Sequence, residues 1–221
     1  MTELDPIGFV KNDFKDKFSI PRQSGMVPVL SEIVFLKSIP PEAFSGITDF
    51  DYIWLIWGFD KTPEPTKYTV RPPRLGGNTR VGVFATRSPF RPNRLGLSSV
   101  KLVSVSCVNS QTILTVSGAD LKDGTPIYDV KPYLPYTDCH ENARFSFAKP
   151  ALEHKLEVVI PNEIAELIPK KTLTDITSVL SLDPRPSYQT DDRTYAFFFS
   201  DYEIKFKVLN NALTVTEITV K

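Results

Sequence analysis

The chain has 221 residues, 41% of them hydrophobic and 24% charged, with a formal net charge of zero, which is the ordinary composition of a soluble globular protein. Because no apolar run approaches the roughly 20 residues of a membrane-spanning helix, and the N-terminus has neither a basic start nor a long apolar stretch, we expect neither a membrane-spanning nor a secreted protein. Two cysteines, two histidines and no CxxC motif argue against a disulfide framework and against a zinc site, so the composition suits a cytoplasmic protein that needs no metal.

The first two thirds of the chain predict a series of short strands. Apolar residues alternate in residues 27–36, and the run 49–59 is almost wholly apolar and aromatic, which is typical of a strand buried on both faces. A hairpin turn is expected at Asn109-Ser110, and no amphipathic helix appears before residue 150. Short, closely spaced strands with Gly/Pro turns indicate a β-barrel or a sandwich. The further predicted strands are 81–86, 97–108, 112–117 and 125–130.

The pattern changes after a polar, irregular stretch at 135–150, which we interpret as a linker. Helices are expected at 162–168 and 172–182, with either Thr172 or Thr174 as the N-cap of the second. Aromatic and β-branched residues predict further strands, the last two joined by a turn at two asparagines. These segments are 195–199, 203–209 and 213–219, with Asn210-Asn211 as the turn.

Two domains follow from this change of pattern. Residues 1–145 are expected to form the strand-rich domain, and residues 150–221 a small α+β domain, so the fold class is mainly β. Neither part contains an internal repeat or a low-complexity tract.

Basic side chains are concentrated between residues 61 and 101. This segment holds nine basic groups and one acid, Glu64, for a net charge of +8, so the rest of the neutral chain carries −8. Six of the nine are arginines, whose planar guanidinium groups match phosphate and carboxylate geometry. A localised positive region on a neutral chain indicates an anionic partner such as phosphate; a solvated basic loop is the alternative.

Four segments rich in proline, glycine and charged residues are not explained by packing alone. In one, an apolar strand runs directly into an arginine-rich turn, a common position for a site. In another, Asp129, Lys131 and Tyr133 alternate, so an extended chain places an acid, an amine and a phenol on one face, where they could handle a proton. The alternatives are surface turns and an exposed, salt-bridged strand face. The four segments are 20–25, 71–78, 82–93 and 120–126, the last leading into 129–134.

Together these segments closely resemble the TsaA-like methyltransferase family. The matching motifs, in the same order and spacing, are PRQSG at 21–25, VRPPRLGGN at 70–78, GVFATRSPFRPN at 82–93 and DLKDGTPIYDVKPYLP at 120–135, and LDPRPSYQ at 182–189 resembles the tail domain of the bacterial members. The resemblance implies a β-barrel domain over 1–145 rather than a Rossmann fold, which agrees with the absence of a G-x-G-x-x-G loop after a strand. It also implies a homodimer that transfers a methyl group from S-adenosylmethionine to N6 of adenosine 37 in tRNA, on a base that already carries a threonylcarbamoyl group.

The resemblance assigns two groups of site residues, and the alternation on one strand face supplies a third. Those implied for the methyl-donor site are Pro21, Arg22, Gln23, Asp60, Lys61, Arg87, Leu97, Ala119, Asp120, Leu121, Lys122 and Asp123. Those implied for holding the anticodon stem-loop are Arg71, Arg74, Asn78, Arg80, Arg91 and Asn93. Asp129, Lys131 and Tyr133 are the candidates for accepting the proton that the acceptor nitrogen loses.

Two other functions compete with methyl transfer. A non-catalytic RNA-binding barrel would explain the basic segment equally well, but it needs no donor pocket. Hydrolysis by Cys139 and His140 rests only on their being neighbours in sequence, which rarely produces catalytic geometry.

Overall fold

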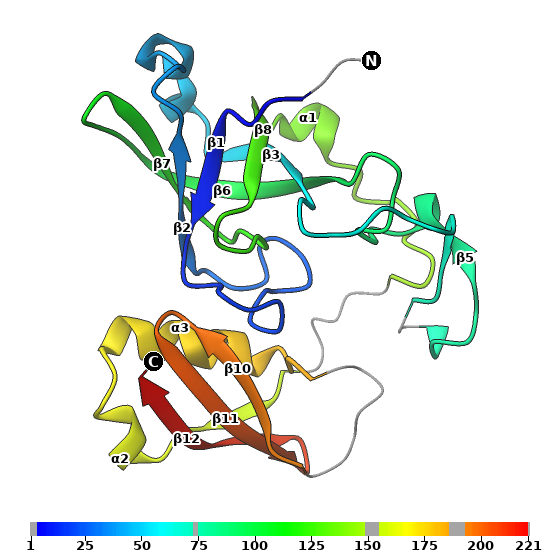
Figure 1. Cartoon of the computed structure of the whole chain (residues 1–221), viewed down its shortest axis with the longest axis vertical. Helices are drawn as coiled ribbons and strands as arrows, with labels where there is room; N and C mark the ends of the chain where they lie inside the picture. The colour runs from blue at the N-terminus through cyan, green and yellow to red at the C-terminus, as the bar shows by residue number, and fades with distance from the viewer. Residues whose placement is uncertain (1–3, 73–74, 149–154, 186–192, 221) are drawn as a thin grey trace.

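The computed structural model describes residues 4–72, 75–148, 155–185 and 193–220. Six antiparallel strands close into a barrel in the order β1-β2-β7-β6-β3-β8, which confirms the barrel expected for the first part of the chain (Figure 1). The strands are β1 (Gly8–Lys11), β2 (Leu30–Phe35), β3 (Tyr52–Gly58), β6 (Leu95–Val108), β7 (Gln111–Ser117) and β8 (Pro126–Pro132).

The side chains of the barrel strands alternate between its interior and its outer surface. On β3, Ile53 and Leu55 are fully buried, whereas Trp54 and Ile56 between them are only half-buried. The expectation that this run is buried on both faces was therefore wrong, because a closed barrel turns one face of each strand inward and the other outward. The outward aromatic residues leave an apolar surface on this side of the barrel.

The hairpin turns agree with the sequence. Asn109 and Ser110 have φ angles of 51° and 62° between β6 and β7, and Asn210 and Asn211 have φ angles of 49° and 64° in the corresponding turn of the tail. Two consecutive residues with positive φ make the turn that matches the twist of the flanking strands, and asparagine tolerates this conformation.

The strand predicted at 81–86 begins at the predicted residue but is shorter than expected. Strand β5 covers only Val81–Gly82 and pairs with β4 (Thr69–Val70), and the chain then enters a 3-10 turn at Val83–Ala85. The hydroxyl of Thr86 donates to the carbonyl of Val83 at 2.7 Å, which closes this turn locally instead of leaving the carbonyl for a sheet. Further short helical turns lie at Pro41–Phe44, Ile47–Asp49 and, as α1, Pro135–Asp138.

The tail forms a four-stranded sheet in the order β10-β11-β12-β9, with two helices beside it (Figure 1). Helix α3 begins after Pro169 with no side-chain cap, so neither Thr172 nor Thr174 is the N-cap; the Thr174 hydroxyl instead bonds the carbonyl of Lys170 inside the helix. Within the described residues, no helix is both long enough and apolar enough to cross a bilayer. The elements are β9 (Glu157–Val159), α2 (Asn162–Ala165), α3 (Lys170–Ser181), β10 (Tyr195–Phe199), β11 (Tyr202–Leu209) and β12 (Ala212–Val220).

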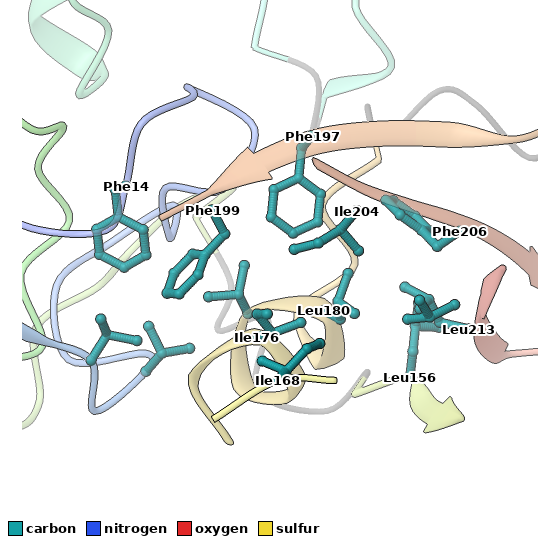
Figure 2. Close-up of a cluster of buried hydrophobic side chains, with 14 of the residues drawn as sticks. Phe14, Leu156, Ile168, Ile176, Leu180, Phe197, Phe199, Ile204, Phe206 and Leu213 are labelled. Carbon is teal, nitrogen blue, oxygen red and sulfur yellow. The ribbon is translucent and has the colours of Figure 1, made fainter. Parts of the chain in front are cut away.

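The hydrophobic core of the tail also contains residues from the start of the chain. Phe14, Val27 and Val29 are buried in the same cluster as Phe199 and Ile176, and the rings of Phe14 and Phe199 meet edge to face with centroids 5.7 Å apart (Figure 2). The amide of Ser200 also donates to the carbonyl of Asp13 at 2.8 Å. The tail is thus anchored against the loop between β1 and β2, the loop that carries the PRQSG motif. The domain limits 1–145 and 150–221 stay a prediction.

Candidate active site

A cavity of about 630 Å³ lies beside the barrel, where the end of β3 and the start of β6 meet the loops that carry the PRQSG and DLKDG motifs. This volume is in the range of small-molecule sites. Ten of the twelve residues expected to hold the methyl donor line it, although they come from five separate stretches of the chain. They are Pro21, Arg22, Gln23, Asp60, Lys61, Arg87, Leu97, Asp120, Lys122 and Asp123.

The other two expected donor residues are elsewhere. Ala119 and Leu121 belong to the buried core of the barrel, with 0% and 1% of their surface exposed, and they do not line the cavity. Their alternation with Asp120 explains this arrangement. In an extended segment successive side chains point to opposite sides. Because Ala119 and Leu121 face the barrel core, Asp120 between them faces the cavity.

Asp120 is held by a short relay of hydrogen bonds. The indole Nε1 of Trp57 donates to the Ser98 hydroxyl at 3.0 Å, and that hydroxyl donates to Oδ1 of Asp120 at 2.5 Å. Burial raises the pKa of the Asp120 carboxyl, and the Ser98 hydrogen bond and the Arg87 charge offset only part of that effect. Trp57 and Ser98 carried no functional signal in the sequence, because each is an ordinary strand residue. The register of β3 against β6 brings the two together, and the pairing of β6 with β7 places Asp120, which follows β7, beside them.

Three arginines border the cavity, and two of them, Arg22 and Arg87, are oriented by contacts with different parts of the chain. The guanidinium of Arg87 donates to Oε1 of Gln23, which joins two of the sequence motifs. Arg22 reaches across to the tail, where its Nη2 donates to the backbone carbonyl of Arg185 at 3.3 Å and lies 3.5 Å from that of Asp183. The tail therefore helps to position a residue of the cavity.

The donor set of this cavity fits S-adenosylmethionine. Arg22 and Arg87 can pair with a carboxylate, Asp120 and Gln23 can bind amino or hydroxyl groups, and apolar residues complete the wall. The apolar lining residues include Ile20, Trp57, Phe59, Leu95 and Leu97.

The residues expected to bind RNA do not form one group. Arg91 lines the cavity of about 630 Å³, called the donor cavity because ten of the expected donor residues line it, and its Nη2 donates to the carbonyl of Thr86 at 3.1 Å. Arg71 lines a second, larger cavity next to the first. Asn78, Arg80 and Asn93 are exposed, with Arg80 donating to the Thr69 hydroxyl at 3.0 Å, and Arg74 lies outside the described residues.

The three candidates for proton transfer share one face, as predicted, but they line neither cavity. Asp129 and Lys131 form an exposed ion pair with a distance of 2.8 Å on β8. Tyr133 lies against Tyr52 and Trp54, with ring centroids 6.3 Å and 5.5 Å apart. Partial burial, then the neighbouring Cys139, raises the pKa of the Tyr133 phenol, so the phenol holds its proton more firmly than a free tyrosine.

The second cavity has a volume of about 1200 Å³ and lies between the loop after β1, the arginine-rich segment and the end of α3. It shares a wall with the donor cavity, formed by Lys17, residues 20–23 and Arg87. The PRQSG segment thus separates two adjoining spaces.

The structure defines a β-barrel protein with two adjoining cavities beside the barrel, the larger of which is lined by several basic side chains. The family model for the tRNA-methyltransferase O N-terminal domain matches residues 9–139 of the sequence, and the family model for the TrmO C-terminal domain matches residues 153–221. The chain therefore belongs to the tRNA-methyltransferase O (TrmO) family, as its motifs indicated.

Individual relatives agree with the family match. The chain is 37% identical to the tRNA (adenine(37)-N6)-methyltransferase of Escherichia coli K12, over 96% of each chain. It is 43% identical to the protein of the same name in Eikenella corrodens, over 72% of this chain and 91% of that one. A crystal structure of TrmO superposes with a TM-score of 0.80 at 27% identity, covering 99% of each chain, and one of TrmO from Pseudomonas aeruginosa with 0.77 at the same identity and coverage.

Proposed function

We propose that this chain methylates N6 of adenosine 37 in tRNA, with S-adenosylmethionine as the methyl donor. The observation that carries the proposal is the convergence of ten expected donor residues, distant in sequence, on one cavity of about 630 Å³. The methyltransferase of Escherichia coli to which the chain is 37% identical has the same named activity.

The chain's own residues would bind and orient the donor. S-adenosylmethionine supplies an activated methyl group on a positively charged sulfur. The guanidinium groups of Arg22 and Arg87 are placed to hold a carboxylate, and the carboxylate of Asp120 to accept hydrogen bonds. Apolar walls exclude water and fix orientation, which is the main demand of a direct displacement. Metal is not needed for any of these roles.

The preferred acceptor is adenosine 37 that already carries a threonylcarbamoyl group. A urea-type N–H is more acidic than a plain exocyclic amine and loses its proton more readily to a positioned base. The modification also adds a carboxylate that Arg91, at the wall of the cavity, can pair with. An unmodified base would leave that arginine unmatched, and such mismatches are heavily penalised.

Two sets of residues compete to accept the proton. Asp129, Lys131 and Tyr133 are the set expected from their alternation along the chain, and they lie on the outer face of the barrel. Asp120 lines the donor cavity itself, and its raised pKa makes its carboxylate a stronger base than an ordinary aspartate. Asp120→Asn and Lys131→Ala, each assayed alone at saturating donor and RNA, show whether methyl transfer depends on one of these sets or on both.

A homodimer would reconcile the two sets. The outer face of β3 and its neighbours exposes apolar side chains, including Tyr52 and Leu97, which are 46% and 56% exposed. Leu97 and Asp129 flank Ile56 in the register of the barrel, so this apolar face extends from the donor cavity to the outer proton-transfer candidates. A second copy packed here would bring its Asp129 and Lys131 toward the first copy's cavity.

Mixing two inactive variants tests the shared site. With Asp120→Asn in one subunit and Lys131→Ala in the other, each mixed dimer keeps one intact site, so random assortment restores about a quarter of wild-type activity. No restoration, with mixed dimers present by mass measurement, would place all residues of a site in one subunit.

The reaction itself is tested with purified protein, S-adenosylmethionine and two tRNA transcripts, one unmodified and one treated with threonylcarbamoylating enzymes. Methylation of the treated transcript alone is expected, checked by mass spectrometry of nucleosides. Equal rates on both would refute the preference but not the methyl transfer. RNA binding without any heat of donor binding would instead favour a non-catalytic RNA-binding barrel.

The proposal places the protein in the cytoplasm, where its two exposed, free cysteines stay reduced.

A further inference from the structure

The larger cavity is lined by exposed aromatic side chains, which indicate a binding site. Phe84, Phe145 and Phe18 are 78%, 55% and 42% exposed, and all three line this one space. Single exposed apolar residues are normal on a protein surface, but a group of large aromatics around one hollow marks an interaction site.

The same cavity is strongly cationic. Its described lining includes five basic side chains, Lys17, Arg22, Arg71, Arg87 and Arg185, against a single carboxylate, that of Asp183. That carboxylate is already paired with Arg185, with contacts of 2.8 Å from both of its oxygens. Lys17 lies over the ring of Phe18, 4.9 Å from its centroid. Aromatic faces interleaved with lysine and arginine are the chemistry of single-stranded nucleic-acid binding.

We propose that this cavity binds an unstacked nucleotide of the RNA loop next to the base being methylated, with Phe84 and Phe145 as stacking platforms and Arg71 on the phosphate. The inference rests on the proposed function, since it assumes that RNA is the substrate. Its position supports it, because the cavity shares the wall formed by residues 20–23 with the donor cavity. A loop whose target base enters the smaller space therefore has its neighbouring nucleotide at the larger one.

The proposal also assigns a role to the tail. The lining of this cavity includes four residues from the end of α3 and the loop after it, Val179, Leu182, Pro184 and Arg185. Without the tail, the cavity would lose this part of its lining. An RNA loop has unstacked bases that proteins can capture in this way, which a duplex lacks.

The test compares Phe84→Ala and Phe145→Ala with Phe90→Ala in the full-length protein. Phe90 is a matched control, since it is 45% exposed in the same motif and lines neither cavity. The probe is a synthetic RNA hairpin with an anticodon-type loop, in which 2-aminopurine replaces one loop base flanking the target adenosine. Binding is followed by anisotropy, stacking by quenching of 2-aminopurine, donor affinity by calorimetry and folding by thermal melting.

Loss of either platform is expected to weaken hairpin binding by about tenfold and to relieve the quenching. Phe84→Tyr keeps a π-face and should restore both, and Phe90→Ala should stay within about twofold of wild type. Donor affinity is unchanged in every variant. Unchanged hairpin affinity in both platform variants, or an equal loss in Phe90→Ala, overturns this inference and leaves the methyltransferase proposal standing. If the wild-type protein binds the hairpin with full quenching but does not bind S-adenosylmethionine, the proposed function is wrong and the nucleotide-binding role of the larger cavity is supported. If it binds no hairpin, both proposals are overturned.

Discussion

The hydroxyl of Ser98 donates a 2.5 Å hydrogen bond to the carboxylate of Asp120, from a residue that is itself 2% exposed. Ser98 lies inside the barrel on β6, and Asp120 follows β7, so the bond joins the barrel interior to the wall of the donor cavity. Because Ser98 also accepts from Trp57, the orientation of the carboxylate depends on the packing of the barrel core.

Asp120→Asn is expected to stabilise the fold at neutral pH and to weaken donor binding. Burial raises the folded-state pKa of Asp120 above its ordinary value of 3.8, so the folded chain keeps this proton to higher pH than the unfolded chain. The contribution of this carboxyl to the free energy of unfolding is therefore complete at low pH, and it is lost as the pH rises through the raised pKa. The amide carries no charge and avoids that loss. At pH 7 the melting temperature of Asp120→Asn should exceed that of wild type by a few degrees, and the difference should shrink as the pH falls toward 3.8. For a chain of this length, each kcal/mol of stability corresponds to about 2–4 °C. Asp51→Asn, at an exposed position outside both cavities, is the control; an Asp120→Asn protein less stable than wild type at pH 7 would contradict the argument.

Ser98→Ala removes the middle of the relay. The buried N–H of Trp57 then loses its partner, which we expect to destabilise the protein by about 1–3 kcal/mol in urea denaturation. The same substitution in a Trp57→Phe background should be less costly, because no indole N–H is left unsatisfied. A double-mutant cycle measures this coupling, and full additivity of the two changes would show that the hydrogen bond contributes nothing.

Gly96→Ala tests whether the donor cavity depends on the placement of Trp57. A Cβ atom at Gly96 would overlap the indole ring of Trp57, and both residues line the cavity. The ring must shift, so donor affinity by calorimetry is expected to fall by about tenfold or more. Gly82→Ala is the matched control, since its added Cβ meets nothing within 4 Å and its φ of −59° suits any residue. Equal donor affinity in the two variants would show that donor binding does not depend on the position of the Trp57 ring.

Arg71→Ala and Arg91→Ala are expected to differ. Arg71 lines only the larger cavity, so its loss should weaken tRNA binding, flatten the salt dependence by about 0.7–0.9 units of slope and leave donor affinity intact. Arg91 lines the donor cavity and should affect both affinities. Lys207→Ala, an exposed charge on β11, controls for the loss of one positive charge. A salt slope reduced equally by Lys207→Ala would mean that the arginines act only through net charge.

Local features of the fold could be predicted from the sequence because their causes are local. The turns at Asn109-Ser110 and Asn210-Asn211 need residues that tolerate positive φ, and asparagine beside two alternating runs is a sufficient signal. Tyr195–Phe199 matches its predicted limits for the same reason. The four-residue β1 and three-residue β9 were missed, since so few residues show no periodicity.

The sequence by itself determined which segments belong together chemically, through motifs long enough to carry a family resemblance and through the placement of the arginines. Only the tertiary structure decided which side chains meet. Ser98 and Asp120 are 22 positions apart, and Arg22 reaches the carbonyl of Arg185 across 163. It also separated Asp129, Lys131 and Tyr133 from the cavity, and Ala119 and Leu121 from its wall. The physical reason is that barrel closure and strand register bring distant residues together through the sum of many core contacts, and no local pattern in the chain encodes that sum.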